Sequence, residues 1–165
     1  MAGTEKVTEY LGRKGAAFEL VSHAETLSSI DEARALGIDA GEVAKVIVVH
    51  HAGGLALFAL PAGSRTSMGA VHKAVGDAHA RFATEDEMAR ELPDYALGSV
   101  PPIAELVRAP LYLDRHLAEH DMVVFAAGTH TDSIKMTVSA LRDLGPHEIV
   151  EVCHVSSAPD ADLPG

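Results

Sequence analysis

The sequence predicts an α/β domain built around a mixed sheet. Helix-like and strand-like stretches alternate along the chain, and two apolar runs, VAKVIVVHH and LALFALP, are joined through the turn-forming residues HAGG. A turn of this kind predicts a hairpin of two antiparallel strands. Because the hairpin interrupts the alternation, the sheet should be mixed rather than a strict βαβ series. No GxGxxG or GxxxxGK[ST] motif occurs, which weighs against a dinucleotide site or a P-loop.

Size and composition predict a single domain. A chain of 165 residues with 47% hydrophobic content can bury one core, and its middle contains no linker-like segment. We expect one domain over residues 1–155 and a flexible C-terminal tail over 156–165, where proline, aspartate and serine are frequent. The apolar runs are much shorter than the roughly 20 residues of a membrane span, and the N-terminus lacks an apolar signal segment. These features predict a cytoplasmic protein without membrane contact.

The net charge and the spacing of potential metal ligands argue against two kinds of function, broad binding of nucleic acid and metal binding. A net charge of −11 argues against broad adhesion to nucleic acid, which needs a basic surface. A local basic groove stays possible, and its candidates are Arg13, Lys14, Arg65, His72 and Lys73. The ten histidines show no zinc-type spacing, so we expect no metal and no cofactor. The single cysteine, Cys153, cannot form an internal disulfide and is expected to be inert packing in a reducing compartment.

The first helix is predicted near the N-terminus. Thr4 can cap the segment VTEYLGRKG, and Gly15 is a plausible stop. Val7, Tyr10 and Leu11 follow helical spacing and should form its buried face. The next segment, AFELVSH, has the pattern of a short strand.

A second helix is predicted over SSIDEARALG. Ser29 and Glu32 have the spacing of a capping box, in which each residue satisfies a backbone N–H at the start of the helix. Gly37 is the expected C-terminal stop. The lysine-containing strand and the hairpin follow directly.

The middle of the chain predicts two more capped helices. Thr66 or Ser67 should open SMGAVHKAVG, which Gly76 ends. After a short strand in HARFA, Thr84 and Glu87 form a second predicted capping box. The segment LPDYALGSVPPIAEL is then turn-rich although it is apolar.

The C-terminal part predicts mainly strands. APLYLD, MVVFAAG, SIKMT and HEIVEV have strand patterns, and RHLAEHD is expected to be a polar bend after the first of them. VSALRDLG should form a capped helix before the last strand.

Lys45 is unusual because both faces of its predicted strand are apolar. An ammonium buried there costs several kcal/mol unless it is paired or partly hydrated. A lysine with a lowered pKa or an anionic partner is typical of a functional site. An ion-paired or snorkelling lysine at the strand end explains the pattern equally well, so both interpretations stay open.

Two polar segments offer further site candidates. In GSVPP, the two prolines stiffen a loop whose amides could point at a carbonyl oxygen that becomes an oxyanion. Thr129, Thr131, Asp132 and Ser133 lie in AAGTHTDSIKM and could bind a small polar ligand. A structural turn and a hairpin turn, respectively, explain the same compositions.

The combination of these motifs resembles a known family. A His and Thr pair in SHAET, then VAKVIVV, GSVPP and AGTHTDSIKM occur in the order seen in the YbaK and prolyl-tRNA-editing family of aminoacyl-tRNA deacylases. The resemblance extends from about Val7 to Val152. It implies a curved mixed sheet, partly barrel-like and flanked by helices. It also implies hydrolysis of the ester in mischarged aminoacyl-tRNA carrying small amino acids such as Ala, Cys or Ser.

The resemblance also implies roles for residues. Lys45 orients the tRNA end, and backbone amides of the Gly98–Pro102 loop hold the substrate carbonyl. Lys45 and Gly98 are therefore the expected catalytic positions. The substrate-binding positions are expected in three segments: His23, Thr26, Ser99, Val100, Pro102, Gly128, Thr129 and Ser133. Several relatives have an aspartate at the position of Ser133, which leaves the roles of Asp132 and Ser133 open.

The partners implied are the acceptor end of a mischarged tRNA and an aminoacyl-tRNA synthetase. Water is expected to be activated with help from the ribose hydroxyl of the substrate, so no Ser–His–Asp triad is needed. Two alternatives stay open: a non-catalytic module that binds aminoacyl-tRNA or a synthetase, and an enzyme acting on small-molecule esters.

Overall fold

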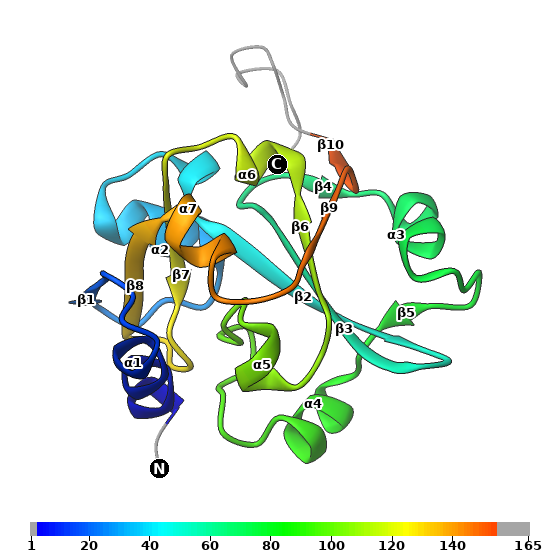
Figure 1. Cartoon of the computed structure of the whole chain (residues 1–165), viewed down its shortest axis with the longest axis horizontal. Helices are drawn as coiled ribbons and strands as arrows, with labels where there is room; N and C mark the ends of the chain where they lie inside the picture. The colour runs from blue at the N-terminus through cyan, green and yellow to red at the C-terminus, as the bar shows by residue number, and fades with distance from the viewer. Residues whose placement is uncertain (1–2, 155–165) are drawn as a thin grey trace.

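The computed structural model describes residues 3–154 and has two main sheets (Figure 1). The five-stranded sheet has the order β5-β2-β3-β6-β9, and the three-stranded sheet has the order β1-β8-β7. The strands of the larger sheet are β2 (Ala44–His51), β3 (Gly54–Pro61), β5 (Arg81–Phe82), β6 (Leu111–Asp114) and β9 (Glu148–Val150). Those of the smaller sheet are β1 (Glu19–Ser22), β7 (Met122–Ala126) and β8 (Asp132–Thr137). A further pair joins β4 (Arg65–Thr66) to β10 (Cys153–His154).

The predicted mixed sheet is confirmed. Strands β2 and β3 form the expected antiparallel hairpin, whereas β3, β6 and β9 run parallel to one another. The two sheets meet at a single parallel bridge between Val43 and Val124, and they do not close into a barrel. The predicted tail over 156–165 lies outside the described residues.

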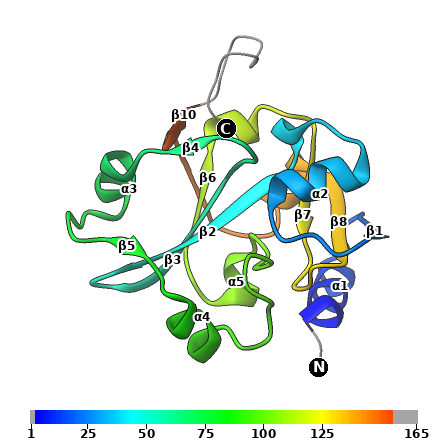
Figure 2. The ribbon, with the colours of Figure 1, turned by 180° about the vertical axis from the view of Figure 1, so that it is seen from behind.

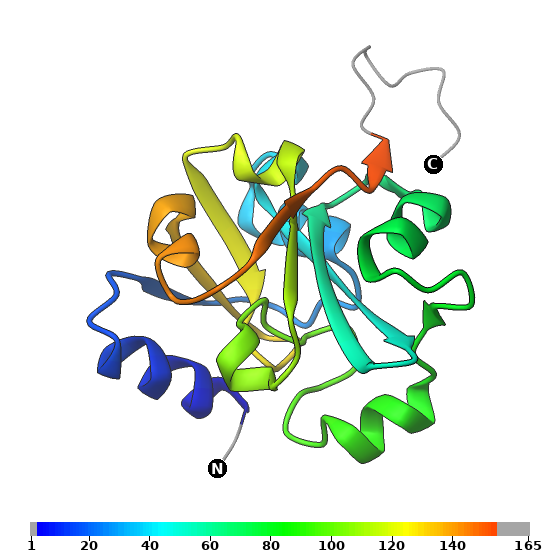
Figure 3. The same ribbon diagram turned by 45° about the vertical axis from the view of Figure 1, so that its right-hand side comes forward.

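The helices surround the two sheets. Their bounds are α1 (Gly3–Arg13), α2 (Ser29–Leu36), α3 (Met68–Val75), α4 (Glu85–Glu91), α5 (Ala104–Val107), α6 (Arg115–Ala118) and α7 (Val138–Arg142), with a 3-10 turn η1 at Ala40–Glu42. Figure 3 shows α3 and α4 beside the β2-β3 hairpin. Figure 2 shows α2 beside the start of β2 and in contact with the smaller sheet. Within residues 3–154, no helix has the length and apolarity needed to cross a bilayer.

Local sequence signals located most helix ends correctly. The predicted face of α1 is buried, with Val7 and Leu11 fully inaccessible. Thr84 and Glu87 form the predicted capping box of α4, and Ser67 caps α3. Thr4, the expected cap of α1, lies inside that helix instead.

Two local predictions were wrong, and a third was incomplete. Ser28, not Ser29, caps α2: its side chain accepts a hydrogen bond from the Asp31 amide. The segment RHLAEHD is not a bend, because Asp114 caps the short helix α6 there. The turn-rich segment after Pro93 contains α5, whose first residue follows Ile103 without a side-chain cap.

Candidate functional site

Lys45 is the second residue of β2 and is half-buried. Its Nζ donates a hydrogen bond to the carbonyl oxygen of Ser64 at 2.6 Å. Desolvation by burial lowers the pKa of Lys45 below its ordinary value, and the nearby Cys153 opposes this shift. The acceptor is a neutral carbonyl rather than a carboxylate, so Lys45 forms no ion pair within residues 3–154. The ammonium keeps hydrogen-bonding capacity for a ligand.

The Gly98 loop exposes backbone amides. Gly98 has φ +80°, a left-handed conformation that favours glycine, and a Cβ added there would lie 4.0 Å from the carbonyl oxygen of Leu27. The Ser99 amide donates to the Ala96 carbonyl at 2.9 Å and is therefore engaged. Within residues 3–154, the amides of Gly98 and Val100 make no hydrogen bond. Gly98 is exposed, whereas Val100 is only 5% exposed, so the Gly98 amide is the more accessible donor of the two.

The turn at Gly128 is hydrogen-bonded to the Gly98 loop. The Gly128 amide donates to the Ser99 carbonyl, and the Ala96 amide donates to the Gly128 carbonyl, each at 2.9 Å. Gly128 has φ +86°, and a Cβ there would lie 3.0 Å from the backbone of Gly3 and 3.1 Å from the ring of Tyr95. Only glycine fits this close approach without displacing its neighbours.

The segment after β1 joins the same cluster. The amides of His23 and Thr26 donate to the carbonyls of Thr131 and His130, each at 2.9 Å. The His130 ring nitrogen Nε2 lies 2.7 Å from the Leu97 carbonyl oxygen, next to Gly98. The three predicted segments around residues 23–26, 96–99 and 128–133 therefore form one hydrogen-bonded unit, which we call the three-loop cluster.

His130 is a residue that sequence reasoning missed. It lies inside the AAGTHTDSIKM segment, but it was not among the candidate residues taken from that segment. Its backbone bonds Thr26 while its side chain bonds Leu97. His130 thus ties two loops of the cluster together.

Thr129 contributes through Asp132 rather than through a free hydroxyl. Desolvation raises the pKa of Asp132, but hydroxyl donors outweigh it and lower the pKa below its ordinary value. The donors are Thr129, Ser22, Thr131 and Thr4. The Thr129 hydroxyl reaches Asp132 Oδ2 at 2.8 Å, and that of Ser22 reaches Oδ1 at 3.0 Å. Asp132 therefore organises the turn from its base.

Ser133 is fully buried and connects two other polar residues. Its hydroxyl is hydrogen-bonded to the Glu32 carboxyl group, and His23 Nε2 lies 2.8 Å from the same hydroxyl oxygen. The other ring nitrogen, Nδ1, lies 2.7 Å from the Ala24 carbonyl oxygen. Desolvation raises the pKa of Glu32, which is only 3% exposed, while Ser133 and His23 oppose the shift. Sequence reasoning missed this role because it assigned Glu32 to a capping box.

Val100 and Pro102 face the protein interior. Val100 belongs to the main core and is 5% exposed. Pro102 is buried and lines a small cavity with Tyr10 and Leu141. No residue of the three-loop cluster lines that cavity. Their side chains anchor the loop, and the structure does not bring them together with the exposed face of Gly98.

Lys45 and Gly98 are related through the start of α2. The Leu27 carbonyl lies 4.0 Å from the position of a Cβ on Gly98, and Ile30 Cδ1 lies 3.1 Å from that of a Cβ on Gly63. The next residue after Gly63 holds the Lys45 ammonium. The segment 27–30 thus lies near Gly98 at Leu27, and near the turn that bonds Lys45 at Ile30.

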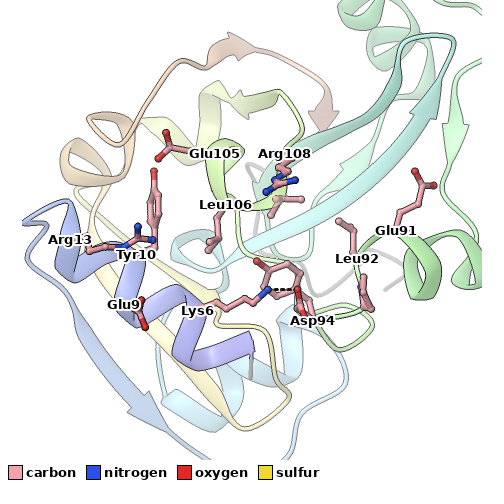
Figure 4. A pocket seen from close by; sticks show the side chains of 13 residues that line it. Lys6, Glu9, Tyr10, Arg13, Glu91, Leu92, Asp94, Glu105, Leu106 and Arg108 are labelled. Atoms are coloured by element: carbon pink, nitrogen blue, oxygen red, sulfur yellow. Dashed lines mark hydrogen bonds and ion pairs between the residues drawn. The ribbon is translucent and has the colours of Figure 1, made fainter. Parts of the chain in front are cut away.

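A well-formed cavity of ≈ 630 Å³ lies elsewhere, between α1 and the segments around α4 and α5 (Figure 4). None of the predicted site residues lines it. Its charged lining has three cationic residues, Lys6, Arg13 and Arg108, and four acidic ones, Glu9, Glu91, Asp94 and Glu105. Figure 4 shows Lys6 paired with Asp94. This mixed lining does not favour a polyanion such as tRNA.

Asp114, His116 and Cys153 bring potential metal-ligand atoms within 4.8 Å of one another. Asp114 Oδ1 accepts hydrogen bonds from the backbone and ring of His116, and Oδ2 accepts one from the Val152 amide at 2.8 Å. Burial raises the pKa of Cys153 to about 11. Asp114 caps α6, which accounts for its contact with the His116 amide.

Comparison with known proteins identifies one family. A family model described as an aminoacyl-tRNA editing domain matches residues 23–144. No curated protein matches the chain. A solved structure of a candidate trans-editing enzyme for prolyl tRNA synthetase is 25% identical, has a TM-score of 0.83, and covers 94% of this chain and 99% of its own. A hypothetical protein has a TM-score of 0.82 at 22% identity, covering 90% and 99%, which shows the fold alone.

Proposed function

Because this chain belongs to the aminoacyl-tRNA editing domain family, we propose that it hydrolyses the ester of mischarged aminoacyl-tRNA carrying a small amino acid. Alanine, cysteine and serine are the proposed amino acids. The reaction is the attack of water on the ester carbonyl, which releases the free amino acid and leaves the ribose hydroxyl on the tRNA. The proposed partner is the acceptor end of the tRNA in the cytoplasm, with a synthetase as a second partner.

Lys45 is proposed to orient the tRNA end. Its ammonium is half-buried and bonded to a neutral carbonyl, so a phosphate or ribose oxygen can approach it without displacing a carboxylate. A partly desolvated cation interacts more strongly with an anion than one in bulk water. This arrangement suits the negatively charged end of a tRNA.

The Gly98 loop is proposed to hold the substrate carbonyl. The observation that carries this proposal is that Gly98 and Val100 have unengaged amides within residues 3–154, while the rest of the loop is fixed by hydrogen bonds to the Gly128 turn. Donors that are already positioned stabilise the oxyanion without reorganisation. An activated ester needs mainly positioning and such donors.

The test is deacylation of a tRNA panel. Prolyl-tRNA acceptors charged with alanine, cysteine or serine are the first choice, since a structural relative is described as a candidate trans-editing enzyme for prolyl tRNA synthetase. We expect Lys45→Met to lower kcat/KM by about 100-fold or more, because it removes the ammonium but keeps most of the side chain. Lys45→Arg should retain more activity because it keeps the charge.

Lys135→Ala is the matched control, since Lys135 is an exposed lysine on β8. It should hydrolyse at the rate of the parent. Thermal unfolding of each variant verifies that the fold is intact. Deacylation by Lys45→Met at the parent's rate would remove Lys45 from the mechanism. If the parent binds the charged tRNAs and hydrolyses none of them, the protein is a binding module instead.

A further inference from the structure

Glu32 is a buried carboxylic acid that lies outside the roles assigned so far. It is on α2, is 3% exposed, and its recorded hydrogen-bond partner is the hydroxyl of Ser133, 101 positions along the chain. Burial raises the pKa of Glu32, and the hydrogen bond with Ser133 and the charge of His23 oppose this shift. A buried acid is costly unless its oxygens are hydrogen-bonded. The hydrogen bond to Ser133 offsets this cost and links α2 to β8.

The hydrogen atoms of this chain of contacts are fully used. The Ala24 carbonyl only accepts, so His23 Nδ1 donates to it. The Ser133 hydroxyl has a single hydrogen to place between His23 Nε2 and Glu32. Either His23 carries both ring protons, donates to Ser133, and Ser133 donates to a Glu32 carboxylate, or a protonated Glu32 donates to Ser133 and Ser133 donates to a neutral His23. Both arrangements leave the His23 ring and the Ser133 hydroxyl occupied.

This occupancy changes the roles of two predicted substrate-binding residues. The polar side-chain atoms of His23 and Ser133 are hydrogen-bonded within the protein and are not free to bind a substrate. We call these two residues the wall of the three-loop cluster. The wall is attached at two further points, the bonds from the His23 and Thr26 amides to Thr131 and His130. The Glu32 contact connects that wall to α2. Two residues before α2, the carbonyl oxygen of Leu27 lies 4.0 Å from the position of a Cβ on Gly98.

We infer that Glu32 is a positioning residue of the editing site: through Ser133 it fixes His23 and so holds the loop over residues 23–27 against the turn over 130–133. The inference rests on the proposed function for its meaning, because the loop it fixes adjoins Gly98. Its structural part can be tested without any activity.

The test compares Glu32→Met with Glu32→Gln by amide hydrogen exchange. Methionine has a similar volume without a hydrogen bond, whereas glutamine is isosteric and keeps a partner for Ser133. In Glu32→Met, we expect the His23 and Thr26 amides to exchange at least about tenfold faster, while those of the β2-β3 hairpin stay unchanged. Glu32→Gln should restore protection to within about threefold of the parent.

Asp31→Asn is the matched control, since Asp31 is the neighbouring acid on α2 and is exposed. It should leave both amides as in the parent. Ser133→Ala removes the link from the other side and keeps the test valid if Glu32→Met does not fold. It should loosen the same two amides. Equal protection in Glu32→Met and Glu32→Gln, or uniform loosening of the whole domain, would overturn the inference.

Activity provides a second measurement. If the protein deacylates mischarged tRNA as proposed, Glu32→Met should lower kcat/KM by about tenfold, mainly through a higher KM, and Glu32→Gln should recover most of the loss. A parent without hydrolytic activity would end the proposed function but leave the exchange result decisive for Glu32. An active parent whose exchange is unaffected by Glu32→Met would end only the role of Glu32.

Discussion

At the scale of single residues, Gly98 shows what a backbone conformation demands. Its φ of +80° lies in the left-handed region, where a side chain costs about 1–2 kcal/mol. The space beside it is open, because the nearest atom to an added Cβ is 4.0 Å away. A side chain at Gly98 would therefore cost energy through backbone strain and not through a steric clash.

We therefore expect Gly98→Ala to lower the free energy of unfolding by about 1 kcal/mol through backbone strain alone. Gly12→Ala is the control, because Gly12 lies in α1 and an added Cβ there meets nothing within 4 Å. That control should raise the free energy of unfolding by roughly 0.5–1 kcal/mol. Urea unfolding measures both. An unchanged stability in Gly98→Ala would show that the loop relaxes to another conformation.

Glu32 gives a pH dependence at the same scale. Desolvation raises its pKa above the ordinary value of 4.5, so the folded protein holds this proton more tightly than the unfolded chain. Stability from this group is therefore complete below pH 4.5 and is lost as the pH rises through the folded-state pKa. Glu32→Gln cannot titrate and lacks this contribution to the slope.

The expected result is that the free energy of unfolding of the parent, relative to that of Glu32→Gln, falls as the pH rises above about 4.5. Urea unfolding of both proteins at a series of pH values measures this difference. Other groups cancel because they are common to both proteins. A difference that rises with pH would mean that the carboxylate, rather than the carboxylic acid, is the form stabilised in the folded protein.

At the scale of elements, the N-cap of α2 is Ser28, one residue before the Ser29 that the sequence pattern predicts. Ser28 has extended backbone angles and accepts a hydrogen bond from the Asp31 amide at 3.1 Å. We expect Ser28→Ala to lower the free energy of unfolding by about 1 kcal/mol, as is usual for loss of an N-cap. Ser29→Ala should be nearly neutral, since alanine favours helix interiors. Equal losses in both variants in urea unfolding would contradict Ser28 as the cap.

Sequence patterns correctly predicted the features that depend on contacts between residues close in the chain. The caps of α3 and α4, the hairpin of β2 and β3, and the buried face of α1 depend on residues close in sequence. Glu32 was assigned wrongly because a capping box and a buried acid have the same local pattern. Its partner, Ser133, lies on a strand that only the tertiary fold brings near, and no spacing along the chain contains that information.

The candidate site follows the same division. The motifs around Lys45, Gly98 and Gly128 identified segments that matter, and the loops around the last two are indeed hydrogen-bonded together. The direction of each side chain could not be predicted, because it depends on the pairing of β1 with β8. That pairing turns Ser133 inward and places His23 beside it.

At the scale of the whole molecule, Lys45 and the turn that binds the Gly98 loop belong to different sheets. The β2-β3 hairpin presents Lys45, and the smaller sheet presents the turn that fixes the Gly98 loop. They are joined by the Val43–Val124 bridge, two residues before Lys45. Relative movement of the sheets would therefore alter the distance between the two expected catalytic positions, and α2 spans that junction on the outside.

The net charge of −11 decides how such a protein can contact tRNA. Long-range repulsion opposes any extended interface, so the proposed contact is confined to the acceptor end and to about two phosphates. Each phosphate contact on a single strand contributes about −0.7 to the slope of log affinity against log salt. Two contacts predict a loss of no more than about tenfold between roughly 50 and 200 mM salt.

The measurement is kcat/KM for a mischarged tRNA over that salt range, with the isolated acceptor stem carrying the same amino acid as the matched substrate. We expect a shallow dependence and similar kcat/KM values for the two substrates, because the rest of the tRNA is held away by repulsion. A loss of about a thousandfold, as six or more phosphate contacts would give, would require a basic surface that the overall charge does not suggest. Such a result would shift attention to Arg65, His72 and Lys73 near α3 as an extended tRNA-binding surface.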